Sequence, residues 1–361
     1  MDNLGNIKHV FASSNTHLGI YQIFNFGCLK NTKFYILKGG PGTGKTVFLK
    51  KLGTELVDSG QNVTYYHNTI NPDFLDAVYV PNLNVMFISY NLVINKDIPT
   101  TLFATIIDLD EFLDEHKILP HKDAIINSYN IVDRCLTHAR FYLESANAIY
   151  RNYLFTTEPC IKQDAKLKYE NALFKTLSGI VSDVNKIGTA QYFYGYAVTG
   201  DGLVDNLHTI IGKSKNIYLV KETLVCSSKQ LMKRICDLFI YRGYDIECYV
   251  SPFDNEKIED IIVKDLSLAI TISNLVRKPK VFPTDIYDFI HCVDDETFDI
   301  ISLPVEKDFK LFNSLLDKAY LYISNANKNL ENIRIYYNAA MDLSNIDQIY
   351  ETTLKEILGY D

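Results

Sequence analysis

One short segment of the chain has the residue types and the spacing of a phosphate-binding loop. Residues 39–46 read GGPGTGKT, which is the pattern Gly-x4-Gly-Lys-Thr. Glycines let successive backbone N–H groups approach phosphate oxygens without a Cβ in the way. We expect Lys45 to reach the β- and γ-phosphates of a nucleotide, and the hydroxyl of Thr46 to coordinate Mg²⁺. The residues expected to bind the nucleotide are Gly39, Gly40, Pro41, Gly42, Thr43, Gly44, Lys45 and Thr46.

The flanking segments are those that such a loop requires. Residues 34–37, FYIL, form a short apolar run typical of a buried parallel strand. After the loop, Phe48, Leu52 and Leu56 recur every four residues and share one face of a helix, which Gly60 is placed to end with a left-handed cap. The order strand, glycine loop, helix favours a nucleotide-binding loop over a glycine-rich turn without a ligand.

The chain contains an internal repeat. Residues 38–52 align with residues 221–235 at an offset of 183, and this frame continues without a gap for about seventy residues. A later segment, residues 139–147, aligns with residues 319–327 at an offset of 180, which implies a small deletion in a loop between the two blocks. We therefore expect two copies of one α/β unit, residues 1–188 and residues 189–361.

The second copy has lost the loop chemistry. Glu222 replaces Gly39, Ser227 replaces Gly44, and Ser228 replaces Lys45. A carboxylate at this place repels a phosphate, and side chains now occupy both glycine positions. We expect the second copy to be unable to hold a triphosphate, and to act as a scaffold or as a regulator of the first.

The acidic residue that usually completes such a site is not obvious. A second apolar strand, residues 84–89, ends in Ser89 where hydrolysis normally needs an aspartate near Mg²⁺. Asp73 and Asp76 follow the strand after the loop helix, at the sheet edge where ligands bind, and are the candidate catalytic carboxylates beside Lys45. Their alternative role is to cap a helix starting at Pro72.

Other polar residues have a weaker claim on the site. Asp108, Asp110 and Glu111 follow another apolar run, and we interpret them mainly as caps and solvated side chains. His67 fits a structural role, and Asn15 and Thr16 are expected to contact a nucleotide base or to start a turn. Catalysis of phosphoryl transfer often uses an arginine that stabilises the transferred phosphate. The sequence does not distinguish Arg134, Arg140 and Arg151 for this role.

The motifs together resemble a family of uncharacterised bacterial ATPases of about this length with two tandem P-loop halves. The resemblance covers nearly the whole chain and depends on HVFASSNTHLGIY, ILKGGPGTGKT, YYHNTINPDFLDAVYVP and the AxxYLxxA helix at residues 139–146. It implies a fold and a nucleotide ligand. The chain departs from the family in its second loop, and at Ser89, where the family tends to carry an acid.

The composition limits where the protein is expected to act and which kinds of partner it can have. The formal charge is −8, no long basic run is present, and no apolar run approaches the length of a membrane span. The N-terminal residues lack the features of a signal peptide. We expect a cytoplasmic protein, with no membrane partner and nucleic acid disfavoured, whereas a protein partner or a homo-oligomer stays open.

The sequence predicts an α/β chain of duplicated P-loop NTPase-like domains, each with a mainly parallel sheet, flanking helices and an added helical hairpin at about 123–153 and 307–332. The expected function is binding of Mg-ATP by the first half, with slow hydrolysis. Two alternatives stay open: a nucleotide sensor without catalysis, and a small-molecule kinase.

Overall fold

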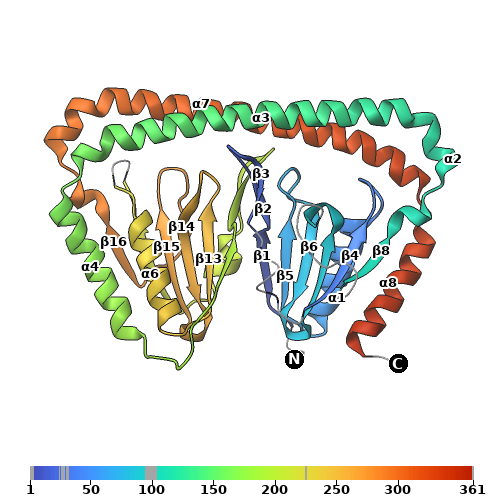
Figure 1. The fold of residues 1–361 in the computed structure, drawn as a ribbon, viewed down its shortest axis with the longest axis horizontal. Helices are drawn as coiled ribbons and strands as arrows, with labels where there is room; N and C mark the ends of the chain where they lie inside the picture. The colour runs from blue at the N-terminus through green and yellow to red at the C-terminus, as the bar shows by residue number, and fades with distance from the viewer. Residues whose placement is uncertain are drawn as a thin grey trace.

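The computed structural model describes residues 4–23, 25, 29, 32–93, 104–223 and 226–359. Two six-stranded mixed sheets stand side by side beneath a pair of long antiparallel helices (Figure 1). In each sheet one strand runs antiparallel to both of its neighbours and the other pairings are parallel. The chain is therefore α/β, as the sequence predicts.

The two sheets have the same strand order. The first runs β1 (Ile7–Phe11), β5 (Val63–His67), β6 (Leu75–Val80), β7 (Val85–Ser89), β4 (Lys33–Lys38) and β8 (Ala104–Asp108). The second, in equivalent order, runs β9 (Ala190–Phe193), β13 (Ile246–Ser251), β14 (Asp254–Val263), β15 (Leu268–Ser273), β12 (Asn216–Lys221) and β16 (Asp285–Asp288). The offset of 183 relates β4 to β12 residue for residue, so the repeat extends to the arrangement of the strands.

A β-hairpin follows the first strand of each copy. These hairpins are β2 (Ser13–Thr16) with β3 (Gly19–Gln22), and β10 (Tyr196–Thr199) with β11 (Gly202–Asp205). Both turns are closed in the same way, since the hydroxyls of Thr16 and Thr199 donate to the carbonyls of Gly19 and Gly202. The hairpins cross at the junction of the two sheets (Figure 1). Thr16 thus starts a turn, which is one of the two roles expected for it.

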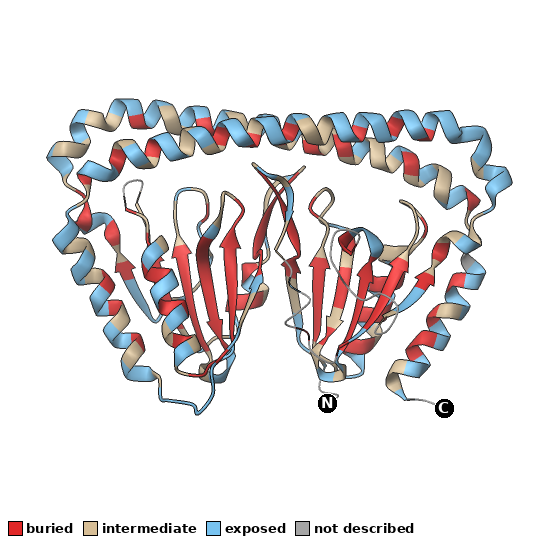
Figure 2. Ribbon diagram, in the orientation of Figure 1, coloured by how far each residue is buried: buried red, intermediate tan, exposed pale blue. Residues whose placement is uncertain are grey.

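The helices pack on and above the sheets. Helix α1 (Lys45–Asp58) packs on the first sheet and α6 (Lys229–Tyr241) on the second. The short helix α5 (Leu207–Ile211) contacts β1, and the short helix α2 (Glu115–Ile118) contacts α7 (Asp295–Ala340). Ser59 is the C-cap of α1 and Gly60 follows with φ of 82°, the left-handed conformation expected there. Buried residues concentrate in the strands and on the sheet-facing sides of these helices (Figure 2).

The predicted helical hairpins are wrong. Residues 123–153 lie within the single helix α3 (Lys122–Thr157), and residues 307–332 lie within the single helix α7 (Asp295–Ala340). These two helices pack against each other along their length instead. Their contact is centred on small and aliphatic residues, among them Ala139, Leu143, Leu316 and Ala319. Each of these helices packs on the equivalent helix of the other copy and not on a second helix of its own.

The last helix of each copy packs on the other copy. Leu173 and Leu177 of α4 (Gln163–Ile180) belong to the core of the second sheet, beside Leu231 of α6. Tyr350 of α8 (Leu343–Leu358) belongs to the core of the first sheet, and its ring meets that of Phe48 edge-on at 5.4 Å. The long helices carry α4 and α8 across the molecule. Residues 1–188 and 189–361 therefore exchange their terminal helices.

The small loop deletion falls between β7 and β8, because the offset is 183 at β7 and 180 at the short helix that follows β8. This stretch includes residues 94–103, which lie outside the described residues. No helix in the described ranges is both long and apolar enough to cross a membrane.

Candidate functional site

The glycine loop lies at the carboxyl end of β4, between the ends of β7 and β8. Gly44 is the N-cap of α1 and has φ of 91°, a left-handed conformation that favours glycine. The backbone of the loop thus leads directly into the N-terminus of a helix, where unpaired N–H groups and the helix dipole favour an anion. Of the eight residues predicted to bind a nucleotide, residues 39–44 form the loop, and Lys45 and Thr46 open helix α1.

Lys45 lies folded over its own loop. Its Nζ donates to the carbonyl oxygens of Gly39 and Gly40, at 2.5 and 2.6 Å. Burial lowers the pKa of Lys45 to about 8, although Asp110 and Asp76 oppose this shift. The ammonium group is therefore held inside the loop by carbonyls that a phosphate would replace as its partners.

Of the two predicted catalytic carboxylates, Asp76 is the one whose charge acts on Lys45. Asp76 is the second residue of β6, and Asn68 donates to its Oδ1 at 3.0 Å. Burial raises the pKa of Asp76 to about 6, while Asn68 and Lys45 act in the opposite direction. The backbone N–H of Leu75 also donates to Thr46 Oγ1, at 3.4 Å. Asp76 and Thr46 thus flank the loop lysine.

Asp73 lies in the exposed turn before β6, where its N–H donates to Asn71 Oδ1. The helix considered at Pro72 is absent: residues 71–74 form a turn, and β6 begins at Leu75. The capping alternative for Asp73 and Asp76 is therefore wrong. A strand follows because Leu75, Ala77 and Val78 are buried against the sheet and helix α1.

Asp108 and Asp110 lie closer to the loop than the sequence indicated. The strand pairing β7–β4–β8 places both neighbouring strands beside the loop, and Ser89 and Asp108 end those strands. Asp108 caps the next turn and forms an ion pair with Lys38. Asp110 Oδ1 accepts the N–H of Gly40 at 3.1 Å. One backbone N–H group of the loop is thus already hydrogen-bonded to a carboxylate of the protein.

The long helix α7 supplies the part of the site that the sequence did not predict. A Cβ added to Gly42 would lie 2.7 Å from the carbonyl oxygen of Arg334, and one added to Gly40 would lie 2.5 Å from the ring of Tyr337. Two glycines of the loop are therefore needed for contact with α7 as well as for any ligand. Only three-dimensional proximity reveals this, since α7 belongs to the second copy in sequence.

Arg334 is the arginine beside the loop. Its guanidinium lies 3.8 Å from the ring centre of Phe74, it forms an ion pair with Glu331, and its charge contributes to the lowered pKa of Lys45. Arg140, one of the three arginines considered from sequence, instead pairs with Glu144 on α3. The site thus has two cationic side chains, one from each copy.

The remaining polar candidates serve the fold. His67 bonds to the carbonyl oxygen of Pro72 and to His9, and burial lowers its pKa. Asn15 Nδ2 donates to the carbonyls of Thr69 and Val198 and so joins the two copies. Both side chains are engaged in contacts that hold strands and hairpins together.

A metal site is not preassembled. Among the described residues, no group of three or more His, Cys, Asp or Glu side chains is arranged to hold a metal ion. Thr46 and Asp76 are the oxygen donors that flank Lys45, and Mg²⁺ bound to a nucleotide keeps several waters and takes few protein ligands.

No protein-family model, curated protein or solved structure proved significantly similar to this chain.

Proposed function

We propose that the first copy binds ATP with Mg²⁺ in the loop of residues 39–46 and hydrolyses it slowly. The observation that carries this proposal is the conformation of the loop, with a left-handed Gly44 opening helix α1 and Lys45 held among loop carbonyls. Such a turn offers backbone N–H groups and one ammonium group to a triphosphate. The same reasoning applies to GTP, which the binding experiment below distinguishes.

The proposal assigns each side chain a task. Lys45 neutralises charge on the β- and γ-phosphates, and Thr46 contributes its hydroxyl to Mg²⁺. Asp76 accepts a hydrogen bond from a water of the metal shell, since its raised pKa of about 6 leaves it mostly ionised at pH 7. Arg334 supplies a second positive charge from the other copy. Turnover is slow because Ser89, not an acid, ends the strand β7.

One observation favours a second candidate, a nucleotide-dependent sensor. Gly40 and Gly42 contact helix α7, which continues over the second sheet. A triphosphate in the loop needs the N–H of Gly40, which Asp110 now accepts, so binding displaces that carboxylate and alters the surroundings of Tyr337. In this case the function of the nucleotide is to reposition α7 and the two copies, and hydrolysis is not required for it.

Calorimetric titration with Mg-ATP and Mg-GTP, with phosphate release followed in the same samples, tests both. We expect about one ATP per chain in the native protein and loss of binding in Lys45→Ala. Release above the background of Lys45→Ala supports the ATPase, and tight binding without release supports the sensor. Binding that Lys45→Ala retains, or absence of binding, contradicts the proposal.

A further inference from the structure

A cavity lies in the second copy at the position equivalent to the nucleotide loop. It has a volume of about 50 Å³, and its lining includes Glu222, Ser227, Ser251 and Glu259. By the offset of 183 these residues correspond to Gly39, Gly44, Asn68 and Asp76 of the first copy. Helix α3 closes the cavity just as α7 contacts the first loop. The second copy has therefore kept a pocket where its loop motif is lost.

The cavity does not suit a phosphate, because the protein supplies its own anion there. Glu222 Oε1 accepts the backbone N–H of Ser228 at 2.6 Å and its hydroxyl at 2.7 Å. Ser228 is the N-cap of α6, so this carboxylate occupies the helix end that binds phosphate in a working loop. In addition, Ser228 and Leu154 stand at the positions equivalent to Lys45 and Arg334, the two cations beside the first loop. Both cations that would attract an anion are gone.

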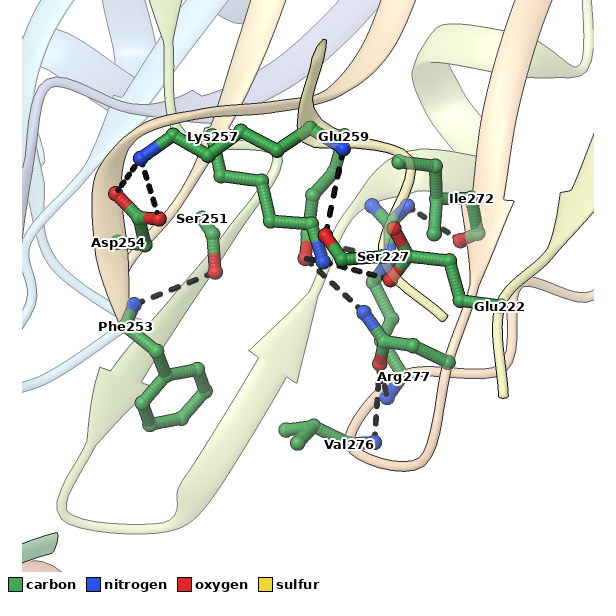
Figure 3. A network of polar contacts seen from close by, with 12 residues as sticks. Glu222, Ser227, Ser251, Phe253, Asp254, Lys257, Glu259, Ile272, Val276 and Arg277 are labelled. Atoms are coloured by element: carbon green, nitrogen blue, oxygen red, sulfur yellow. Dashed lines mark hydrogen bonds and ion pairs between the residues drawn. The ribbon is translucent and has the colours of Figure 1, made fainter. Parts of the chain in front are cut away.

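Two buried cations, Lys257 and Arg277, lie beside the carboxylates of the cavity. Lys257 Nζ donates to Glu222 Oε2 at 2.6 Å, and both side chains are only 4% exposed (Figure 3). Burial alone would lower the pKa of Lys257, but Glu222 and Glu259 outweigh burial and raise it. Arg277 lies 3.8 Å from Glu259 and pairs closely with Asp260. Glu222 and Glu259 are therefore each paired with a buried cation.

The described residues that line the cavity carry negative charge and aromatic rings. Glu222, Glu259 and Asp308 contribute carboxylates, and none of the lining residues is Lys or Arg. Tyr153 is 5% exposed, and its hydroxyl is buried without a hydrogen-bond partner. Buried polar groups normally have partners, so a ligand atom is the natural complement of this hydroxyl. The aromatic walls are formed by Tyr150, Tyr153, Tyr196, Phe253, Phe309 and Phe312.

We propose that this cavity binds a small organic amine as its cation, with the ammonium group on the carboxylates of Glu222 and Glu259 and its apolar body against the aromatic walls. Carboxylates and aromatic faces both attract an organic cation, whereas they repel an organic anion. A volume of about 50 Å³ holds roughly three or four water-sized groups, which limits the enclosed part of the ligand to a short chain.

Three matched probes test the proposal on the native chain: n-butylamine as its cation, n-butanol and butyrate. Calorimetric titration should give butylammonium a Kd in roughly the millimolar range, as suits so few atoms. Butanol should bind about tenfold more weakly and butyrate more weakly still. Butanol or butyrate binding as tightly as butylammonium, or absence of butylammonium binding, overturns the proposal.

Three substitutions, one of them a control, locate the ligand. Tyr153→Phe keeps the ring and removes only the hydroxyl, so it should fold and weaken butylammonium binding roughly three- to tenfold. Tyr241→Phe is the matched control, because Tyr241 is 79% exposed on α6. Lys45→Ala should bind butylammonium as the native chain does. Unchanged binding in Tyr153→Phe, or lost binding in Lys45→Ala, would place the ligand elsewhere and overturn the assignment.

Discussion

Phe11 and Tyr194 occupy equivalent positions in the two copies and are hydrogen-bonded to each other through both backbone groups. Phe11 N–H donates to the carbonyl of Tyr194 at 2.9 Å, and Tyr194 N–H donates to that of Phe11 at 3.1 Å. Such a reciprocal pair lies on the axis of an approximate two-fold symmetry. The loop of residues 39–46 and the cavity beside Glu222 are therefore equivalent places on opposite sides of this axis, which is why their differences can be assigned to individual residues.

The pKa of Lys45 predicts how nucleotide affinity depends on pH. A lysine that titrates at about 8 in the free protein is charged at pH 7 and mostly neutral at pH 9. Because phosphate binding needs the charged form, affinity should be nearly constant up to about pH 7, fall about twofold by pH 8 and fall about tenfold by pH 9. Calorimetric titrations across this range check the prediction. Lys45→Met should bind weakly and show no such fall; an equal fall in that variant would assign the effect to another group.

Arg334→Ala should reduce phosphate release more than it reduces ATP affinity. The guanidinium lies on Phe74 beside the loop, where it can stabilise charge that develops during transfer, and such arginines contribute about 10³-fold or more. We expect at least a tenfold loss of turnover, measured under saturating Mg-ATP. Arg140→Ala, an exposed arginine on α3, is the control. Equal turnover in the two variants would contradict the role of Arg334.

Breaking the ion pair of Glu222 and Lys257 should destabilise the second copy strongly. Both side chains are 4% exposed, so Lys257→Met removes the nearest cation from a buried carboxylate, at a cost of about 3–5 kcal/mol. Glu222→Gln should cost less, because Lys257 keeps Glu259 at 3.7 Å. The double variant should cost less than the sum of the singles. Urea unfolding measures all three.

Glu256→Gln serves as the control for this cycle, because Glu256 is 86% exposed in its pair with Lys229. Its effect should stay below about 1 kcal/mol. Additive single effects at Glu222 and Lys257 would mean that the two side chains do not stabilise each other.

The exchange of α4 and α8 predicts that neither half folds alone. Residues 1–188 on their own expose Leu173 and Leu177, and they lose Tyr350 from the core around Phe48. Expressed separately, residues 1–188 and 189–361 should be poorly folded, whereas co-expression should give a one-to-one complex. Size-exclusion chromatography and circular dichroism distinguish these outcomes, and a compact, stable 1–188 fragment would contradict the prediction.

The local part of the site could be predicted from sequence, since the loop, its strand and its helix are consecutive in the chain. Gly60 has the left-handed conformation expected, and β4 lies where FYIL indicated. The repeat also predicted that both copies share one order of elements. These signals are short-range or periodic, so a single sequence contains them.

The residues of the site that are distant from the loop in sequence could not be predicted. Arg334 reaches the loop only because α7 is one continuous helix that crosses to the first copy, and periodicity does not say which partner an apolar stripe will meet. The same limit produced the incorrect hairpins. Asp110 was undervalued for a similar reason, because the position of β8 beside β4 depends on sheet order and not on order in the chain.

The exchanged helices also carry information about origin. A single copy of the unit would have its own final helix directed away from its own sheet, and would expose the core surface that this helix should cover. Two such chains would cover each other's exposed core surface by exchanging their final helices around the axis marked by Phe11 and Tyr194. Joining the two genes end to end would preserve that dimer while fixing its stoichiometry. After fusion, the loop residues of one half can change while those of the other half do not, which a homodimer encoded by one gene cannot do.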